Sequence, residues 1–195
     1  MATTNFNEDQ VLLVRPNLWV GGAIPTDGTA VTLSYSSTLK GYLPGGAGWR
    51  HIGYTGQPAW GNTRDTKERR FVNVKGLVSA LPSNDALTLK VPMYQITAEN
   101  IALAYNGTIT MQANGGAIVD FGSKETYDYT SVIVTTCDQN DIPGYFLLYS
   151  GFPTDSGELS YGNVDDLMFE VTFTAKQVDD YAGLGHKYFD STMVS

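Results

Sequence analysis

The sequence has little of what enzymes and metal proteins use for their chemistry. Its 195 residues contain one cysteine, Cys137, and two histidines, His51 and His186. A single cysteine excludes an intrachain disulfide and a multi-cysteine zinc site, which favours a reducing compartment. Neither histidine has a second histidine or cysteine at ligand spacing, so we expect no zinc site. Cys137 follows an apolar run, and we interpret it as an ordinary packed thiol at a strand end.

Sequence motifs for nucleotides and for nucleophilic catalysis are also missing. There is no Walker A loop, dinucleotide fingerprint or nucleophile elbow. The glycine-rich GGAG (45–48) is not followed by a lysine or a helix start, so it predicts a turn. The acidic run DQND (138–141) lacks the glycine and distal glutamate of a calcium loop. Further acidic pairs lie at 165–166 and 179–180, and none is singled out as catalytic. We therefore expect no catalytic residue, no cofactor, no metal and no enzymatic activity.

Charge is scarce and mostly negative. Charged residues make up 16% of the chain, and the net charge is −8. About a quarter is usual for soluble domains. An acidic chain is poorly suited to gripping nucleic-acid phosphates, because such binding depends on lysine and arginine. The N-terminus has no basic region followed by an apolar run, and no window approaches the roughly 20 apolar residues of a membrane span, so we expect neither a signal peptide nor a spanning helix.

What the sequence does contain is a series of strand patterns. The clearest is LMFEVTFTA (167–175), in which alternate residues are apolar. LTLKVPMYQ (87–95) alternates in the same way. We expect the remaining strands at 30–35, 50–55, 69–78, 108–111, 116–121, 127–136 and 145–151.

The connections differ in length and character. SSTLKGYLPGGAGW (36–49) and QPAWGNTRDTKE (57–68) are predicted as long loops, and loops of this length tend to be functional. LPSNDA (81–86) is predicted as a turn. Pro16 is expected to keep the apolar segment 11–20 from being a regular central strand, because proline cannot donate a ladder hydrogen bond.

One short helix is expected, at about 97–106. Thr97 suits the N-cap, and Glu99 lies in the first turn, where the helix dipole favours a negative charge. Ile96 and Ile101 have the spacing of a hydrophobic staple. Asn106-Gly107 can close the helix through a left-handed residue. A helix this short must pack on another surface to be stable.

These elements predict a single domain over residues 1–195. The fold class is mainly β: a β-sandwich or barrel of roughly eight to ten strands with one short packed α-helix and long loops. Residues 1–9 are expected to form a flexible N-terminal arm. Residues 176–195 are expected to form a C-terminal extension, which has aromatic residues but no clear period.

The order of these segments resembles a known family. The carriers are GWRHIGYTG (48–56), ERRFVNVKGLVS (68–79) and the strand-then-helix unit LTLKVPMYQITAENIALAYNG (87–107). The closing strands YTSVIVTT, YFLLYSG and LMFEVTFTAKQVDD complete the pattern. Over about residues 30–178 the chain resembles the major tail tube proteins of long-tailed bacteriophages.

The resemblance implies a structural virion protein. Its subunits would join their sheets edge to edge into a hexameric ring with an inner β-barrel, and the rings would stack into a tube. The helix would cover the outside of the sandwich. DNA would pass through the lumen without specific binding. The implied partners are further copies of the chain and tail assembly proteins such as tape measure, tail tip and terminator. The implied location is the virion tail, with host cytoplasm during assembly and no membrane.

Ring stacking needs a second interface, different from the edges within a ring. Our candidate segments for it are the arm 1–9, the 57–68 loop and the 176–195 tail. The candidate assembly contacts are Trp49, Trp60, Arg64, Arg69 and Arg70.

Other functions remain open at this stage. One is a capsid decoration protein or another virion β-sandwich. A second is a carbohydrate-binding β-sandwich that uses some of the 12 tyrosines and three tryptophans. A third is a hydrolase with a pair of acids that meet in space.

Overall fold

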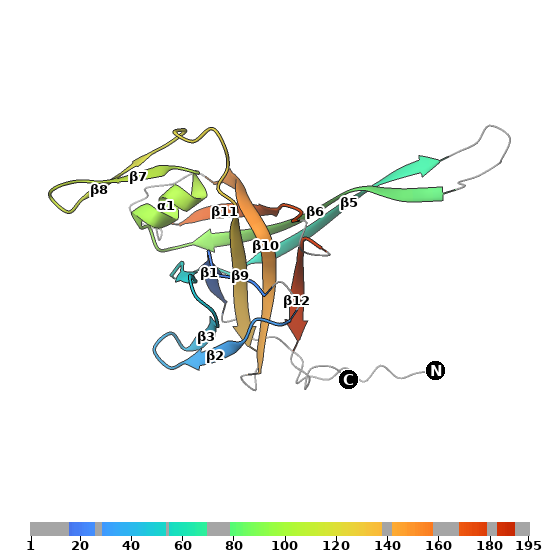
Figure 1. Ribbon diagram of the computed structural model, residues 1–195, viewed down its shortest axis with the longest axis horizontal. Coiled ribbons are helices and arrows are strands. Elements are labelled where there is room, and N and C mark those ends of the chain that lie inside the picture. The colour runs from blue at the N-terminus through green and yellow to red at the C-terminus, as the bar shows by residue number, and fades with distance from the viewer. Residues whose placement is uncertain are drawn as a thin grey trace.

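The computed structural model describes residues 16–25, 29–53, 55–69, 79–137, 142–157, 168–178 and 183–189. These residues form antiparallel sheets and one helix, α1 (Ala98–Ala104) (Figure 1). The strands are β1 (Asn17–Val20), β2 (Leu33–Ser36), β3 (Gly41–Pro44), β4 (Arg50–His51), β5 (Ala59–Arg69), β6 (Ser79–Met93), β7 (Thr108–Met111), β8 (Ala117–Asp120), β9 (Thr130–Cys137), β10 (Pro143–Ser156), β11 (Phe169–Ala175) and β12 (Gly185–Phe189). The expected mainly β fold with one short helix is confirmed.

One sheet folds over on itself to make the body. Its strand order is β4-β1-β9-β10-β11-β6-β5, and β12 pairs with β10 outside this path. The first half of β10, up to Leu148, pairs with β12, and the second half, from Gly151, pairs with β11. The register of β10 against β9 shifts between these two residues. The long strand β10 therefore belongs to both layers and turns the sheet from one into the other.

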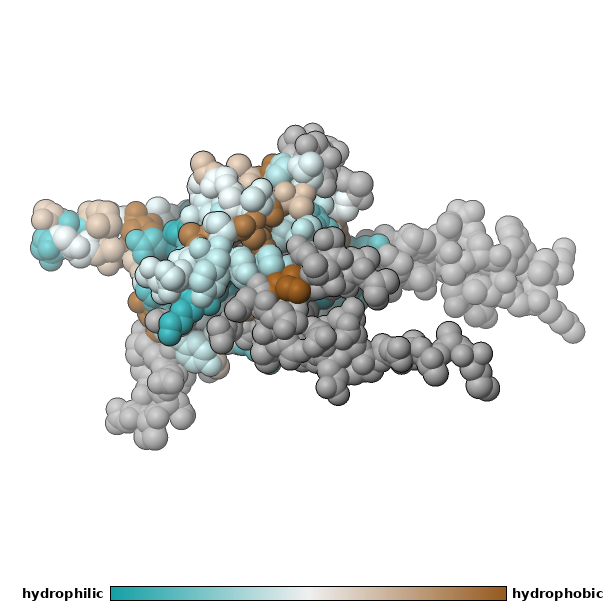
Figure 2. Space-filling model, turned by 90° about the horizontal axis from the view of Figure 1, so that it is seen from below, coloured by the Kyte–Doolittle hydropathy of each residue, from teal (hydrophilic) through white to brown (hydrophobic). Residues whose placement is uncertain are grey.

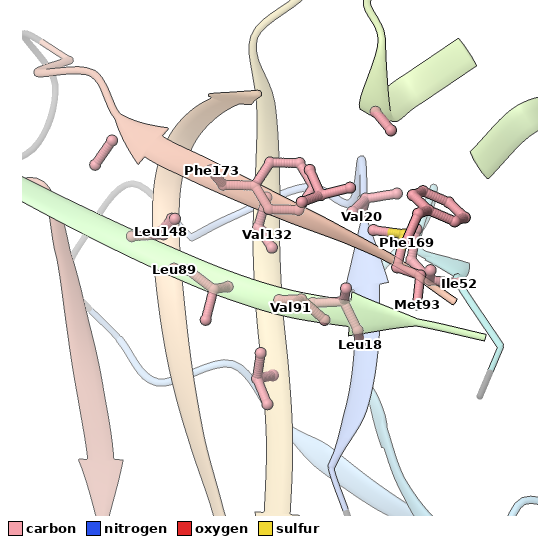
Figure 3. Close-up of a cluster of buried hydrophobic side chains, with 14 residues drawn as sticks. Leu18, Val20, Ile52, Leu89, Val91, Met93, Val132, Leu148, Phe169 and Phe173 are labelled. Carbon is pink, nitrogen blue, oxygen red and sulfur yellow. The ribbon is translucent and has the colours of Figure 1, made fainter. Parts of the chain in front are cut away.

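The main core lies between these two layers (Figure 3). One layer contributes side chains from β1 and β9, and the facing layer contributes side chains from β6 and β11. In β11 every second residue is buried, as its alternating sequence predicts. The labelled core residues are Leu18, Val20, Ile52, Leu89, Val91, Met93, Val132, Leu148, Phe169 and Phe173.

A second core lies on the other face of β1, β9 and β10. It contains the buried side chains of Trp19, Ile133, Tyr145 and Leu147. The chain between β1 and β4 covers it, including the β2–β3 hairpin, and the Thr135 hydroxyl donates to the Tyr42 carbonyl at 2.8 Å. Cores on both faces explain why β9 is almost continuously buried, and its buried hydroxyls of Ser131, Thr135 and Thr136 donate to backbone carbonyls.

Helix α1 begins and ends where the sequence predicts. The Thr97 hydroxyl accepts the Asn100 N–H at 3.2 Å, which is N-cap geometry. Asn106 is left-handed, with φ of 51°, and the Gly107 N–H donates to the Ala102 carbonyl at 2.8 Å. This is the Schellman arrangement that terminates many helices. The hydroxyl of Tyr105 donates to the Gly157 carbonyl at 2.9 Å and ties the helix end to the chain after β10.

Three predicted connections are strands instead. Residues 57–68 are not a loop, because β5 occupies Ala59–Arg69. Residues 81–86 are not a turn but part of β6, which begins at Ser79. The 36–49 connection contains β3, which pairs with β2 after a turn that ends in left-handed Lys40. All three segments are too polar or too rich in glycine to show the alternation of a half-buried strand.

Other predicted bounds also change. Residues 50–55 supply only the two-residue strand β4, with Thr55 in an isolated bridge to Met93. The proposal that Pro16 would exclude a central strand was wrong. β1 begins directly after it and lies between β4 and β9, because a proline before the first strand residue removes no ladder hydrogen bond. Of the predicted strand 69–78, residues 70–78 lie outside the described part of the chain.

Candidate assembly surfaces

The hairpin formed by β5 and β6 extends well beyond the body. Its pairing runs from Ala59–Lys90 at the root to Arg69–Ser79 at the outer end, with one register shift between Asp65 and Thr66. β6 also pairs with β11 inside the body, but only over Thr88–Met93. Within the described residues, the remaining part of β6 has only β5 as a strand partner. These two strands form the projecting arm in Figure 1.

Trp60 lies at the root of this arm, on strand β5 and not in a loop. Its ring stacks on Phe146 of β10, with centroids 4.8 Å apart, and it packs against the main core. The Lys187 ammonium lies over the Phe146 ring, 4.6 Å from its centroid. The Trp60 indole N–H is buried without a hydrogen-bond partner among the described residues. Trp60 therefore joins β5 to β10, and a role in contacts between subunits stays a prediction.

Trp49 is also occupied within the chain. Its indole N–H donates to the Gly45 carbonyl at 3.0 Å, and its ring packs at the edge of the second core. A Cβ added to Gly22 would lie 1.9 Å from the ring, so only glycine fits beneath it. Trp49 thus holds the segment before β4 against the sheet, and its predicted assembly contact is untested.

Two of the three arginine candidates, Arg64 and Arg69, belong to the outer part of the arm. Arg64 pairs with Asp85 across the hairpin, and Arg69 pairs with Ser79 at its outer end. Arg70 lies outside the described residues. The structure therefore places Arg64 and Arg69 on strand β5 of the projecting arm, whereas Trp49 lies before β4.

A second hairpin, β7–β8, leaves the body at the opposite end (Figure 1). It forms a separate two-stranded sheet and rests on α1. Met111 is 69% exposed and Ile118 is 49% exposed, and Phe121, just beyond the hairpin, is 63% exposed. Figure 2 shows this projection as a mixture of apolar and polar residues. Both strands were predicted from the sequence, but the hairpin was not predicted as an assembly surface.

The predicted C-terminal extension is partly a strand. β12 pairs with β10 from Gly144–Phe189 to Leu148–Gly185, so this part of 176–195 belongs to the sheet and is not a free tail. A Cβ on Gly185 would lie 2.2 Å from the Leu147 carbonyl oxygen, which shows how closely the two backbones approach. The short run GHKYF lacks alternation and gave no strand signal. The N-terminal arm 1–9 lies outside the described residues.

The two histidines occupy different half-buried sites. His51 Nε2 lies 3.2 Å from Asn17 Oδ1, and the ring packs against Trp19. His186 lies between two tyrosine hydroxyls of β10, Tyr145 and Tyr149. Burial lowers the pKa of both histidines, and burial raises the pKa of Tyr145.

The structure also bears on the residues considered for chemistry. Cys137 is buried at the end of β9, as predicted for a packed thiol. The acidic groups at 138–141, 165–166 and 179–180 lie outside the described residues. Within the described residues, no group of three His, Cys, Asp or Glu side chains is arranged to hold a metal ion. The tryptophans that a sugar platform would use are directed inward: Trp19 is buried, and Trp49 and Trp60 are partly buried.

Comparison with known proteins finds little in sequence. No protein-family model matches the chain, and no curated protein matches it. One similar solved structure is a chain of the cryo-EM structure of the anti-feeding prophage (AFP) baseplate, 6-fold symmetrised. It is 9% identical, with a TM-score of 0.43, over 96% of this chain and 97% of that one. A likeness of this extent leaves the function to be argued from the residues themselves. The one described helix is too short to cross a bilayer, and the described residues contain no other candidate span.

Proposed function

We propose that this protein is a structural subunit that assembles with copies of itself into stacked, hexameric rings, forming a tail tube through which viral DNA is delivered. The observation that carries the proposal is the β5–β6 arm. It extends beyond the sheet that stabilises its root. An isolated two-stranded hairpin is marginally stable in water. A long projecting arm is therefore best explained if a neighbouring subunit covers it.

The open strand edges support assembly within a ring. Among the described residues, β4 pairs with β1 alone and β12 pairs with β10 alone, so each leaves one edge unpaired. Such edges promote association with other chains. If an edge of one copy pairs with a different edge of the next, the contact is head to tail and closes into a ring when the rotation allows.

The arm supports the second, stacking interface. It lies at the opposite end of the molecule from β7–β8, so the chain offers two unlike projections along its longest axis (Figure 1). Unlike surfaces at opposite ends are what an open stack of identical rings requires. The candidate contacts Arg64 and Arg69 lie on this arm. We therefore keep the 57–68 segment as a candidate for the contact between stacked rings, although it forms strand β5 and not a loop.

The remaining parts of the proposal follow from charge and from the sequence resemblance. A chain with net charge −8 suits a lumen that repels DNA and lets it slide. The partners are then further copies of the chain and the tape measure, tail tip and terminator proteins of a tail. The protein has no catalytic role and needs no cofactor in this proposal.

Negative-stain electron microscopy of the purified chain over a concentration series tests the proposal, together with its mass in solution from light scattering. We expect hexameric rings or hollow tubes as the concentration rises. A chain that is strictly monomeric at its solubility limit would contradict self-assembly. Closed dimers without rings would contradict head-to-tail contacts, because a two-fold contact uses the same patch on both copies.

A further inference from the structure

His186 holds strand β12 through both nitrogens of its ring. Nε2 lies 3.1 Å from the Tyr145 hydroxyl oxygen, and Nδ1 lies 2.8 Å from the Tyr149 hydroxyl oxygen. Both tyrosines belong to β10, the strand on which β12 pairs. Tyr145 is fully buried, and its hydroxyl oxygen also accepts the Val31 N–H at 2.8 Å. One imidazole thus links the C-terminal strand to the second core.

We assign the neutral tautomer of this ring from its hydrogen bonds. The Tyr145 oxygen already accepts from Val31, so we direct its own O–H to Nε2 of His186, which then accepts. A neutral imidazole carries its proton on the other nitrogen. With this assignment Nδ1 donates to the Tyr149 oxygen.

A second proton on the ring breaks this arrangement. It would place an N–H at Nε2 opposite the O–H of Tyr145, and two donors cannot bond each other. The Tyr145 hydroxyl would have to turn away and lose its acceptor inside the core, and leaving a buried donor unpaired is costly. We propose that His186 is an acid-sensitive latch, whose protonation releases strand β12 from β10 while the rest of the sheet stays folded.

Strand β12 can open separately because its attachments are local. It has five residues and, among the described residues, one strand partner. Besides the histidine, the side-chain attachments described for β12 include the Tyr188 ring stacked on Tyr145, with centroids 5.1 Å apart, and Lys187 over Phe146. Short edge elements with few buried contacts are where proteins open locally.

Among the described residues around His186, the histidine is the group that changes charge in weak acid. Tyr145 and Tyr149 of β10 face it, Tyr188 of β12 stacks on Tyr145, and Lys187 is next to it in sequence. Tyrosine and lysine keep their protons between roughly pH 5 and 7. Burial lowers the pKa of His186 in the folded chain. The open form binds the proton more tightly, so closure is favoured above the ordinary histidine pKa of about 6.5 and is lost as the pH falls through the folded pKa.

The chain's two histidines make the test direct. NMR of the full-length protein with labelled histidine reports two imidazoles, which His51→Gln and His186→Gln assign. Hydrogen exchange of peptides covering 183–189, corrected for intrinsic rates, reports opening of β12 over the same pH range. The protein is kept dilute enough to be monomeric by light scattering, so the result does not depend on the proposed tube.

We expect β12 to lose protection in step with His186 titration, by about tenfold for each unit by which folding lowers the pKa. Peptides from β6 and β11 should keep their protection. His51→Gln should behave like the wild type, and His186→Gln should exchange independently of pH in this range. Full protection of β12 with His186 protonated would overturn the latch, as would a transition that disappears in His51→Gln. Loss of protection in β6 and β11 at the same pH would show global unfolding and also overturn it.

Discussion

The hairpins β5–β6 and β7–β8 project from opposite ends of the same body, and they differ in what supports them. The inner end of β6 lies between β5 and β11, so the long arm continues a strand of the main sheet. The β7–β8 hairpin has no strand beside it within the described residues, and α1 packs against it. One projection is anchored by backbone pairing and the other by side-chain packing.

They also differ in charge. Residues 64–69 of the arm include both acidic and basic side chains. In the other hairpin, residues 108–119 include no charged side chain. Charged residues on an exposed edge discourage indiscriminate pairing. The arm is therefore protected until a complementary surface meets it. In the β7–β8 hairpin the charged residue Asp120 lies at the base, opposite Thr108, and Met111 and Ile118 are exposed on opposite faces further out. Exposed apolar side chains of this kind favour burial against an apolar partner.

The largest effect is expected from shortening the arm. Replacing residues 64–85 by Asn-Gly leaves Thr63 and Ala86, which already pair, joined by a two-residue turn. The buried part of β6, from Leu89 onward, is unchanged. We expect the shortened chain to fold with a cooperative melt and to form no stacked tubes under the electron microscope. Tubes of normal length from this variant would exclude the arm as the stacking contact.

The same arm shows why part of the fold could not be predicted from the sequence. The alternation over 87–95 is visible because that part of β6 buries one face on the core, and 167–175 is visible for the same reason. Most of segments 57–68 and 81–86 lies beyond the part of β6 that pairs with β11, and their sequences show no apolar period. Propensity alone then favours loop and turn over strand.

The contacts that the candidate residues make within the chain could not be predicted from the sequence. Nothing in QPAWGN (57–62) indicates that Trp60 stacks on Phe146, because the two residues are far apart in sequence and meet only when β10 turns between layers. Strand β12 was not predicted because glycine usually disfavours a strand. Glycine is needed at position 185 because the Leu147 carbonyl approaches it closely, and this contact cannot be seen in the sequence. Helix α1, by contrast, is set by local capping residues and was predicted correctly.

The root of the arm should be the most sensitive single position. Trp60→Ala removes a ring packed between β10 and the core, and we expect a loss of roughly 2 to 4 kcal/mol in unfolding free energy. Trp60→Phe is the matched control: it keeps a stacking ring and removes the unpaired indole N–H, so its loss should be much smaller. Equal losses in urea titrations of both variants would contradict the stacking argument.

The other hairpin should matter for association and not for stability. Met111→Asp places a charge on an exposed apolar side chain, and we expect an unchanged melting temperature with self-association weakened about tenfold, or roughly 1.4 kcal/mol. Met111→Gln is its control, because it replaces the apolar side chain with a polar one of similar length and adds no charge. Sedimentation of both variants over a concentration series measures the difference. Weakening by Met111→Asp alone would point to net charge and not to burial of the Met111 side chain.

The smallest effect, and the one that separates the two hairpins most directly, is the salt dependence of association. A contact made by the charged arm should weaken between low salt and about 0.5 M salt, because the screening length falls from tens of ångströms to a few. A contact made by the outer part of β7–β8 should not, since residues 108–119 carry no charge and Asp120 lies at the base of the hairpin. Arg64→Gln with Arg69→Gln should therefore flatten the salt dependence of sedimentation, while Met111→Asp weakens association without flattening it. If the arginine double variant kept the full salt dependence, the charged residues of the arm would not form the stacking interface, and the edges of β4 and β12 would become the surfaces to test.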